Sequence, residues 1–129
     1  MQPFDPATTP YVSLATFRKN GAMVATPVWV AALDAHYYVF SEARAGKMKR
    51  LRNNPRIRLA ACSYNGKLAS DWLEGEAHRV SDPDLIRQVY TRFTAKYGWQ
   101  FRLTNLLSRL AGRYDQRAMI EISLAPAEA

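Results

Sequence analysis

The sequence predicts a mainly β fold: a small antiparallel barrel of six strands, with one short helix and a helical pair near the C-terminus. Short apolar or alternating runs predict the strands, and Asn-Gly pairs at 20–21 and 65–66 favour tight turns between them. After Ser81 the apolar residues recur at helical spacing instead. A chain of 129 residues suits one domain, so we expect a single domain over residues 1–129.

The first half of the chain is expected to form a three-stranded antiparallel meander. A lead-in with three prolines precedes a strand at 11–17, and the 20–21 turn leads into a strand at 23–33. The Asp34-Ala35 turn then leads into a strand at 36–41. Pro27 cannot donate a hydrogen bond to a sheet, so we expect a bulge or a sheet edge there.

Capping and breaking residues define the later elements. Asn54-Pro55 ends a short helix at 45–53, and Ser81-Asp82-Pro83 begins the helical pair. Gly75 suggests a bulge within its strand. The remaining elements are strands at 56–63 and 70–80, a helix that runs up to Gly98, a helix at about 101–111 and a closing strand at 117–124.

Composition limits the partners and the setting. The net charge of +7 favours anionic partners: nucleic acid, a membrane surface, or a phosphorylated or carboxylated small molecule. No apolar run approaches the roughly 18 to 20 residues of a membrane span, and the N-terminus lacks the pattern of a secretory signal. A single cysteine, Cys62, excludes an intramolecular disulfide. We therefore expect a cytoplasmic protein with no membrane partner.

A dense group of cations follows the third expected strand. The first N–H groups of a helix that begins at a strand end form an anion site, and Ala45 and Gly46 would lie there. Lys47 and Arg50 share one face of the helix, and Ser41 adds a hydroxyl. These groups would form a phosphate site, whereas the alternative is a solvated helix face. The seven cations are Arg44, Lys47, Lys49, Arg50, Arg52, Arg56 and Arg58.

Other chemistry-bearing residues give weaker patterns. Trp29, Trp72 and Trp99 could stack on a ring system or fill the core. His36 and His78, with one cysteine and no partner motif, predict no metal site. No tyrosine or histidine has a spacing that marks it as a general acid. The sequence therefore leaves the catalytic residues unassigned.

The order of motifs resembles the pyridoxamine 5'-phosphate oxidase-like split β-barrel superfamily, FMN-binding-like in fold. The resemblance rests on "YVSLATFRKNG", "ATPVWV", "YYVFSEARAGKMKRLRNNPRIRLAAC" and "LEGEAHRV". Within that superfamily the chain looks most like the small oxidoreductases that depend on the deazaflavin coenzyme F420. The resemblance implies a six-stranded split barrel that forms a homodimer, with two cofactor sites at the dimer interface.

The resemblance also implies which residues bind the cofactor. The "TPVW" segment would pass beneath the ring with its backbone, and Trp72 would reach the site of the neighbouring subunit. Lys49 lies in the phosphate motif and would assist. The implied cofactor-binding residues are Thr26, Pro27, Val28, Trp29, Ser41, Ala45, Gly46, Lys47, Lys49, Arg50 and Trp72.

Charge helps to choose the cofactor. Coenzyme F420 carries a phosphodiester and several carboxylates, which suits a groove lined by Lys47, Lys49, Arg50 and Arg52. Gly46 stands where the pyridoxamine phosphate oxidases proper have an arginine, which disfavours an FMN oxidase. We expect an oxidoreductase in which reduced F420 transfers a hydride to a small-molecule acceptor.

Alternatives stay open at this point. FMN is the second cofactor, and a protein that binds flavin, deazaflavin or haem without turnover is a further alternative. Nucleic acid is not the expected partner, because the charge is clustered rather than spread along a groove. The helical segment 82–112 has no clear family counterpart, so we expect core or dimer surface there and no assigned function.

Overall fold

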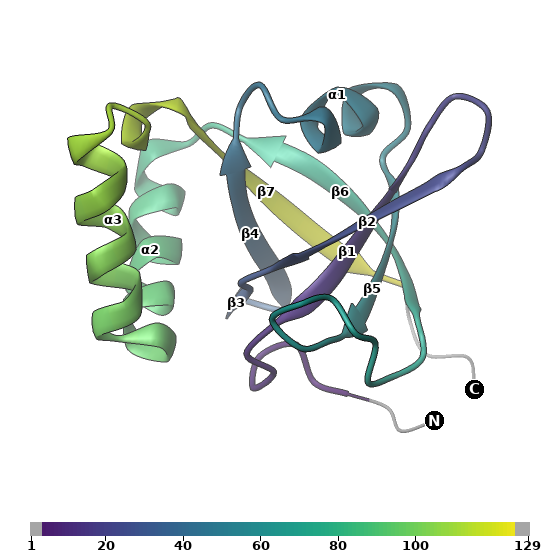
Figure 1. Cartoon of the computed structure of the whole chain (residues 1–129), viewed down its shortest axis with the longest axis horizontal. Helices are drawn as coiled ribbons and strands as arrows, with labels where there is room; N and C mark the ends of the chain where they lie inside the picture. Colours follow the sequence, from purple (N-terminus) through teal and green to yellow (C-terminus); the bar gives the residue numbers. More distant parts are fainter. Residues whose placement is uncertain (1–3, 126–129) are drawn as a thin grey trace.

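The structure, a computed structural model, describes residues 4–125 and contains one antiparallel sheet and three α-helices (Figure 1). The sheet has seven strands in the order β2-β1-β5-β6-β7-β4-β3. The strands are β1 (Val12–Phe17), β2 (Met23–Val28), β3 (Ala31–Leu33), β4 (His36–Glu42), β5 (Arg56–Ala61), β6 (Leu73–Val80) and β7 (Arg117–Leu124). The helices are α1 (Gly46–Asn53), α2 (Pro83–Tyr97) and α3 (Trp99–Leu110). The predicted mainly β class with a short helix and a helical pair is confirmed.

The expected strand at 23–33 is two strands, β2 and β3, which form the opposite edges of the sheet. Only Trp29 and Val30 join them, so the chain itself connects the two edges and the sheet curls into a partly open barrel (Figure 1). The expected count of six strands is therefore wrong by one. The expected meander is also wrong, because β2 pairs with β1 while β4 pairs with β3 and β7.

The backbone groups of Val30, at the corner between β2 and β3, explain why the expected strand divides into two. Val30 is fully buried, and its N–H donates to the Tyr97 hydroxyl at 3.0 Å instead of to a strand. Its carbonyl accepts from Lys96 Nζ at 2.7 Å. Because α2 satisfies both groups, the strand ends there without a cost in unpaired polar atoms. Pro27 lies on the edge strand β2, as one of the two expectations for it required.

Turn residues behave as predicted in the hairpins but not in β6. Gly21 and Gly66 both have a φ of +88° at the tips of the Asn-Gly turns. Gly75 makes no bulge, since it pairs with Ile57 and Leu124 in unbroken register. A Cβ at Gly75 would lie 2.6 Å from the carbonyl oxygen of Ser123, so this glycine permits close approach of β7.

Two apolar cores lie on the two faces of the sheet. Leu14, Leu59 and Ile120 belong to the core inside the barrel, which α1 closes with Met48 and Leu51. The second core lies between the outer face of β3, β4 and β7 and the helical pair. Its aromatic residues Phe93, Phe101 and Tyr38 are at most 2% exposed.

The helical pair is an αα-hairpin on the outside of the barrel. The Asp82 carboxylate caps α2 by accepting from the N–H of Asp84 at 3.0 Å. Gly98, with a φ of +59°, separates α2 from α3. α2 lies against the sheet and α3 lies outside α2 (Figure 1). In the described part of the chain, no helix is long and apolar enough to cross a membrane.

Two buried tyrosines predict a loss of stability at high pH. Burial, with a hydrogen bond to Glu121, raises the pKa of Tyr38 to about 12, and burial raises that of Tyr97 to about 12. Below pH 10 both phenols are protonated in the folded and unfolded chain. Between about pH 10 and 12 only the unfolded chain ionises, so the free energy of unfolding falls there. Urea titrations should show the gap between wild type and Tyr38→Phe shrinking over this range. A constant gap would contradict the assignment.

Candidate functional site

α1 places two cations on one flank, at the end of the barrel that it closes. Met48 and Leu51 point into the barrel core and hold the helix in place. Lys47 and Arg50, three residues apart, therefore lie together beside the end of β1, as the spacing predicts. Arg50 Nε donates to Thr16 Oγ1 at 2.6 Å, and Thr16 is buried. This bond fixes the direction of the guanidinium.

Within residues 4–125, no acidic side chain compensates the charges in this group. Burial lowers the pKa of Lys47, and the neighbouring Arg50 lowers it further. Burial also lowers the pKa of Arg50, with a second contribution from Arg18. Among the described residues, no carboxylate forms an ion pair with Lys47, Arg50 or Arg18. Three cations brought together with no counter-ion from the described part of the chain form a site that an anion would stabilise.

The beginning of α1 adds backbone donors to the cations. Ala45 is the N-cap, no side chain caps the helix, and its first turn contains no acidic residue. The first N–H groups are thus open to an anion. A Cβ on Gly46 would lie 2.9 Å from Arg50 Nη1, so the glycine leaves room for the guanidinium beside the helix start. Ser41 lies near the end of β4, opposite Ala118.

The other cations of α1 do not join this group. Lys49 is exposed and lies about 200° around the helix from Lys47. Arg52 lines a different pocket of about 280 Å³, together with His78 and Arg79. The expectation that four cations of α1 line one groove is therefore wrong. The cause is the helical period, which puts Arg52 on the opposite flank of the buried face from Arg50.

β2 runs beside this group. Val24 is opposite Thr16 in the register, and Thr26 and Pro27 follow two and three residues later. At about 3.3 Å per residue, these two lie roughly 7 to 10 Å along the strand from the Thr16 level. Pro27 is exposed and Val28 is half-buried, so one side of the strand is open.

The two candidate tryptophans lie away from the cations. Trp29 stacks on Tyr97 with 4.5 Å between ring centroids, which assigns its side chain to the second core. Trp72 precedes β6, whereas α1 meets β6 near Ala77, five residues further along. That separation is roughly 16 Å. Trp72 thus does not join Lys47 within one chain.

Sequence reasoning missed Arg18 and Thr16. Arg18 reads as part of a hairpin turn, and Thr16 reads as one more residue of an apolar strand. The available signal was a polar residue near the end of a mainly apolar strand, with a cation directly after the strand. Only the contact of α1 with β1 shows that both belong with Arg50.

The cysteine and histidine side chains that the structure describes form no second reactive centre. Cys62 is buried, and burial raises its thiol pKa, which agrees with an inert role. His36 Nδ1 lies 3.0 Å from Ser123 Oγ, and His78 is exposed. In residues 4–125 no group of three or more His, Cys, Asp or Glu side chains could hold a metal ion.

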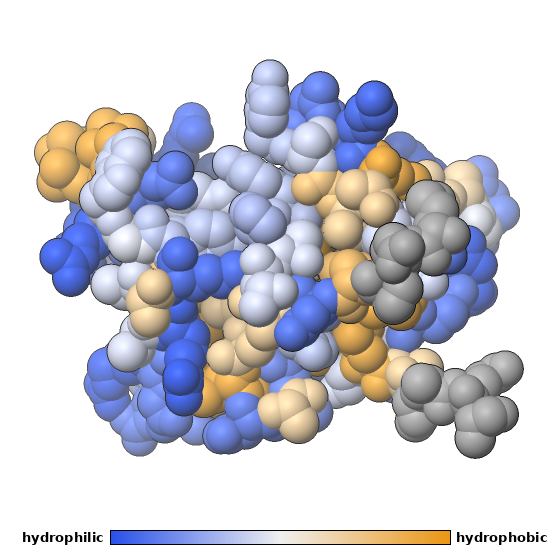
Figure 2. Space-filling model, turned by 90° about the horizontal axis from the view of Figure 1, so that it is seen from below, coloured by the Kyte–Doolittle hydropathy of each residue, from blue (hydrophilic) through white to orange (hydrophobic). Residues whose placement is uncertain are grey.

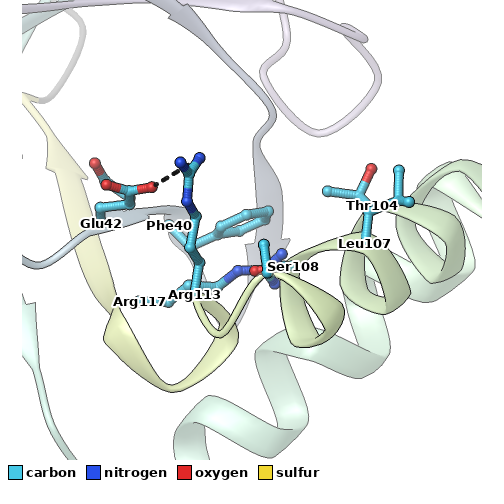
Figure 3. Close-up of a pocket in the computed structure, with 9 residues that line it drawn as sticks. Phe40, Glu42, Thr104, Leu107, Ser108, Arg113 and Arg117 are labelled. Atoms are coloured by element: carbon cyan, nitrogen blue, oxygen red, sulfur yellow. Dashed lines mark ion pairs between the residues drawn. The ribbon is translucent and has the colours of Figure 1, made fainter.

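A separate pocket of about 440 Å³ opens between the end of β4 and α3 (Figure 3). Arg113 and Glu42 form an ion pair across it at 3.8 Å, and Ser41 contributes to its lining. Arg117 lies over the Phe40 ring at 4.5 Å and donates to Asn105 at 2.7 Å. Both arginines thus have partners, whereas no ion pair links Lys47 to another described residue.

Solved structures share the fold at low sequence identity. A protein of unknown function from Agrobacterium tumefaciens is 16% identical, with a TM-score of 0.69, 94% of this chain covered and 51% of that chain. A conserved hypothetical protein from Mycobacterium tuberculosis is 20% identical, with a TM-score of 0.70 and coverages of 93% and 76%. The haem storage protein HutZ from Vibrio cholerae is 16% identical, with a TM-score of 0.66 and coverages of 96% and 86%.

These comparisons define the fold and the family. The chain spans about half the length of the Agrobacterium protein. None of the curated proteins compared with the chain matches it. The model of the pyridoxamine 5'-phosphate oxidase family matches residues 6–127, a span that includes the helical pair. The chain therefore belongs to the pyridoxamine 5'-phosphate oxidase family.

Proposed function

We propose that this protein is an oxidoreductase that binds coenzyme F420 beside α1 and transfers a hydride from the reduced coenzyme to a small-molecule acceptor. The observation that carries the proposal is the group formed by Lys47, Arg50 and Arg18, three cations with no carboxylate partner among the described residues. Together with the open start of α1, they match the donor set that a phosphate diester requires.

The strand geometry supports a ring next to this phosphate site. Thr26 and Pro27 lie roughly 7 to 10 Å along β2 from the level of Thr16. A tricyclic ring joined to its phosphate by a short sugar-like chain spans a distance of this order. The ring would lie against the backbone of residues 26–29, while the side chain of Trp29 supports the strand from the second core.

In this proposal the residues of the chain bind and orient the cofactor. When bound, the reduced deazaflavin supplies the hydride. Lys47, Arg50 and the free N–H groups at Gly46 and the helix start hold the phosphate, while the Ala45 N–H donates to the carbonyl of Glu42 at 3.0 Å. Ser41 adds a hydroxyl at the strand end before α1. We assign no proton donor from this chain.

A homodimer completes the proposed site. Trp72 lies far from Lys47 in its own chain, so it contributes to a cofactor site only if that site belongs to a second copy. We propose such a dimer, with the two sites at the interface, and we propose that it works in the cytoplasm.

FMN is the second candidate, because the family that the chain belongs to is named for an oxidase and its fold typically binds flavin. The net charge of +7 favours the more anionic F420 over FMN. A non-catalytic role with haem is the third candidate, since the similar HutZ is a haem storage protein. Against haem, His36 already contacts Ser123, and His78 is an exposed strand residue.

Fluorescence titration of the protein with F420, FMN and haem in parallel, at physiological salt, tests the proposal. We expect micromolar or tighter binding of F420 and weaker binding of FMN. Preference for FMN would instead indicate an FMN-dependent oxidoreductase, for which oxygen is a candidate oxidant. Preference for haem, or no binding of either flavin, would overturn the proposal. A steady-state assay with reduced F420 and an electron acceptor then separates an enzyme from a carrier.

A further inference from the structure

The outer face of α3 carries a stripe of exposed apolar side chains. They recur every three or four residues, so they share one face of the helix. Their exposed fractions run from 45% for Leu103 to 77% for Leu110. Figure 1 shows α3 at the edge of the molecule, and Figure 2 shows hydrophobic side chains gathered at that edge. The members of the α3 stripe are Trp99, Leu103, Leu106, Leu107 and Leu110.

The fold of the described chain does not use this stripe. Phe101 is the buried residue of α3, and it meets Phe93 with 5.4 Å between ring centroids. At 100° per residue, the centre of the stripe lies roughly opposite Phe101. The stripe therefore faces away from α2. Five large apolar side chains on one exposed face mark an interaction surface.

The charged side chains of α3 itself are all positive. Arg102 and Arg109 lie on one flank of α3, and Arg113 follows the helix. Residues 99–113 contain no acidic side chain. On the other flank, the pocket of about 440 Å³ shares Leu107 with the stripe and contains Thr104, Ser108 and Arg113 (Figure 3). Arg113 is mostly exposed and forms a 3.8 Å ion pair with Glu42, which an incoming phosphate could replace.

A second copy of the chain fits this surface poorly. From Trp99 to Leu110 the stripe is roughly 16 Å long, and a stable interface buries about 800 Å² per partner. One such helix face supplies well under that area. Two copies packed through α3 would also bring their arginines together without acids from the same helix.

An anionic bilayer surface fits both features. A helix with tryptophan and leucine on one face and arginine beside it lies in the interfacial plane, with its apolar side about 5 to 10 Å deep. Lipid phosphates then meet the arginines on the flanks. We propose that the α3 stripe docks the protein onto an anionic membrane surface, with α3 parallel to it. The proposal departs from the sequence-based expectation of no membrane partner, and it does not depend on the proposed cofactor.

Flotation of the full chain with lipid vesicles tests this docking. The vesicles contain phosphatidylcholine alone, or equal parts of phosphatidylcholine and phosphatidylglycerol, at ~0.15 M salt. We expect the protein to float with the anionic vesicles and to stay behind with the neutral ones. The double variant Leu106→Gln/Leu110→Gln should lose at least about ten-fold in partitioning, because two exposed side chains no longer enter the lipid.

A control variant replaces two exposed apolar or aromatic side chains elsewhere by glutamine. Tyr64 and Leu68, also exposed, lie in the loop before β6, so Tyr64→Gln/Leu68→Gln should float as wild type does. Arg102→Glu/Arg109→Glu should weaken binding to the anionic vesicles only. Failure of the wild type to float, or equal flotation of the α3 double variant, would overturn the proposal. So would a halved particle mass in that variant, which would assign the stripe to contact between copies.

Discussion

Replacing Lys47 by alanine is expected to weaken cofactor binding about 10- to 150-fold, or about 1.5 to 3 kcal/mol. Lys47 is half-buried beside Arg50, and burial has already lowered its pKa. The folded protein thus holds a partly desolvated cation whose compensating charge comes from the ligand. Loss of that contact removes a charge-assisted hydrogen bond where water screens it least.

Lys49→Ala is the matched control. Both lysines lie on α1, but Lys49 is exposed and on the outer side of the helix. We expect its change to leave the dissociation constant within about two-fold, the range of an exposed ion pair. Fluorescence titration of the two variants against F420 measures the difference. Equal losses would mean that diffuse charge, and not a built site, attracts the cofactor, and no loss in either would remove Lys47 from the site.

The same lysine gives the binding a pH dependence. The cationic form of Lys47 binds the phosphate, so affinity is expected to fall as the pH rises through its lowered pKa. A bound phosphate stabilises the cation and moves this fall to higher pH. Lys47→Ala should lack the fall in this range. A wild-type profile parallel to that of the variant would contradict the role of Lys47.

Local signals predicted most of the fold. Asn-Gly pairs, the Asp82-Pro83 helix start and Asn54-Pro55 each fix a backbone conformation within a few residues, and the structure places turns and helix ends there. The division of 23–33 could not be predicted in this way. It depends on Tyr97 and Lys96, which lie 66 or 67 residues beyond Val30 and replace its strand partners.

In the candidate site too, local spacing predicted the arrangement of residues within α1 but not their contacts with distant parts of the chain. Helical spacing alone brings Lys47 and Arg50 together and separates Arg52 from them. The hydrogen-bond partner of Arg50, Thr16, comes from β1, and the neighbouring cation Arg18 follows that strand. Both lie more than thirty residues earlier, and no spacing within α1 reveals them. The side chain of Trp29 lies in the second core because α2 brings Tyr97 against it. The residues of the "TPVW" segment therefore divide between strand backbone and core packing.

Replacing Lys96 by methionine is expected to lower the free energy of unfolding by about 2 to 3 kcal/mol. The ammonium donates to the carbonyls of Pro6, Thr9 and Val30, at 3.0, 2.8 and 2.7 Å. These bonds use all three of its N–H donors. Burial lowers the pKa of Lys96 to about 8, which still leaves the amine mainly protonated at neutral pH. Methionine keeps the length of the side chain but leaves three carbonyls without their donor.

The three carbonyls belong to segments that are far apart in the chain. Pro6 and Thr9 lie in the lead-in, and Val30 is the corner between β2 and β3, so Lys96 joins the lead-in, the corner and α2. Tyr97 strengthens the same junction by donating to the carbonyl of Pro10 at 2.7 Å. The helical pair, which sequence reasoning left without a role, thus braces the corner where the barrel closes.

Urea unfolding at neutral pH, with Lys67→Met as the control, measures the contribution of this junction. Lys67 is exposed in a turn, and its change should alter the free energy of unfolding by no more than about 0.5 kcal/mol. Hydrogen exchange should quicken in Lys96→Met at the amides of residues 7–9 and at Val30, where the lost bonds lie. If both variants unfold alike, water replaces the ammonium and the corner is held by Tyr97 and packing alone. A loss confined to Lys96→Met would instead make α2 the element that fixes the end of β2, and with it the strand proposed to support the cofactor ring.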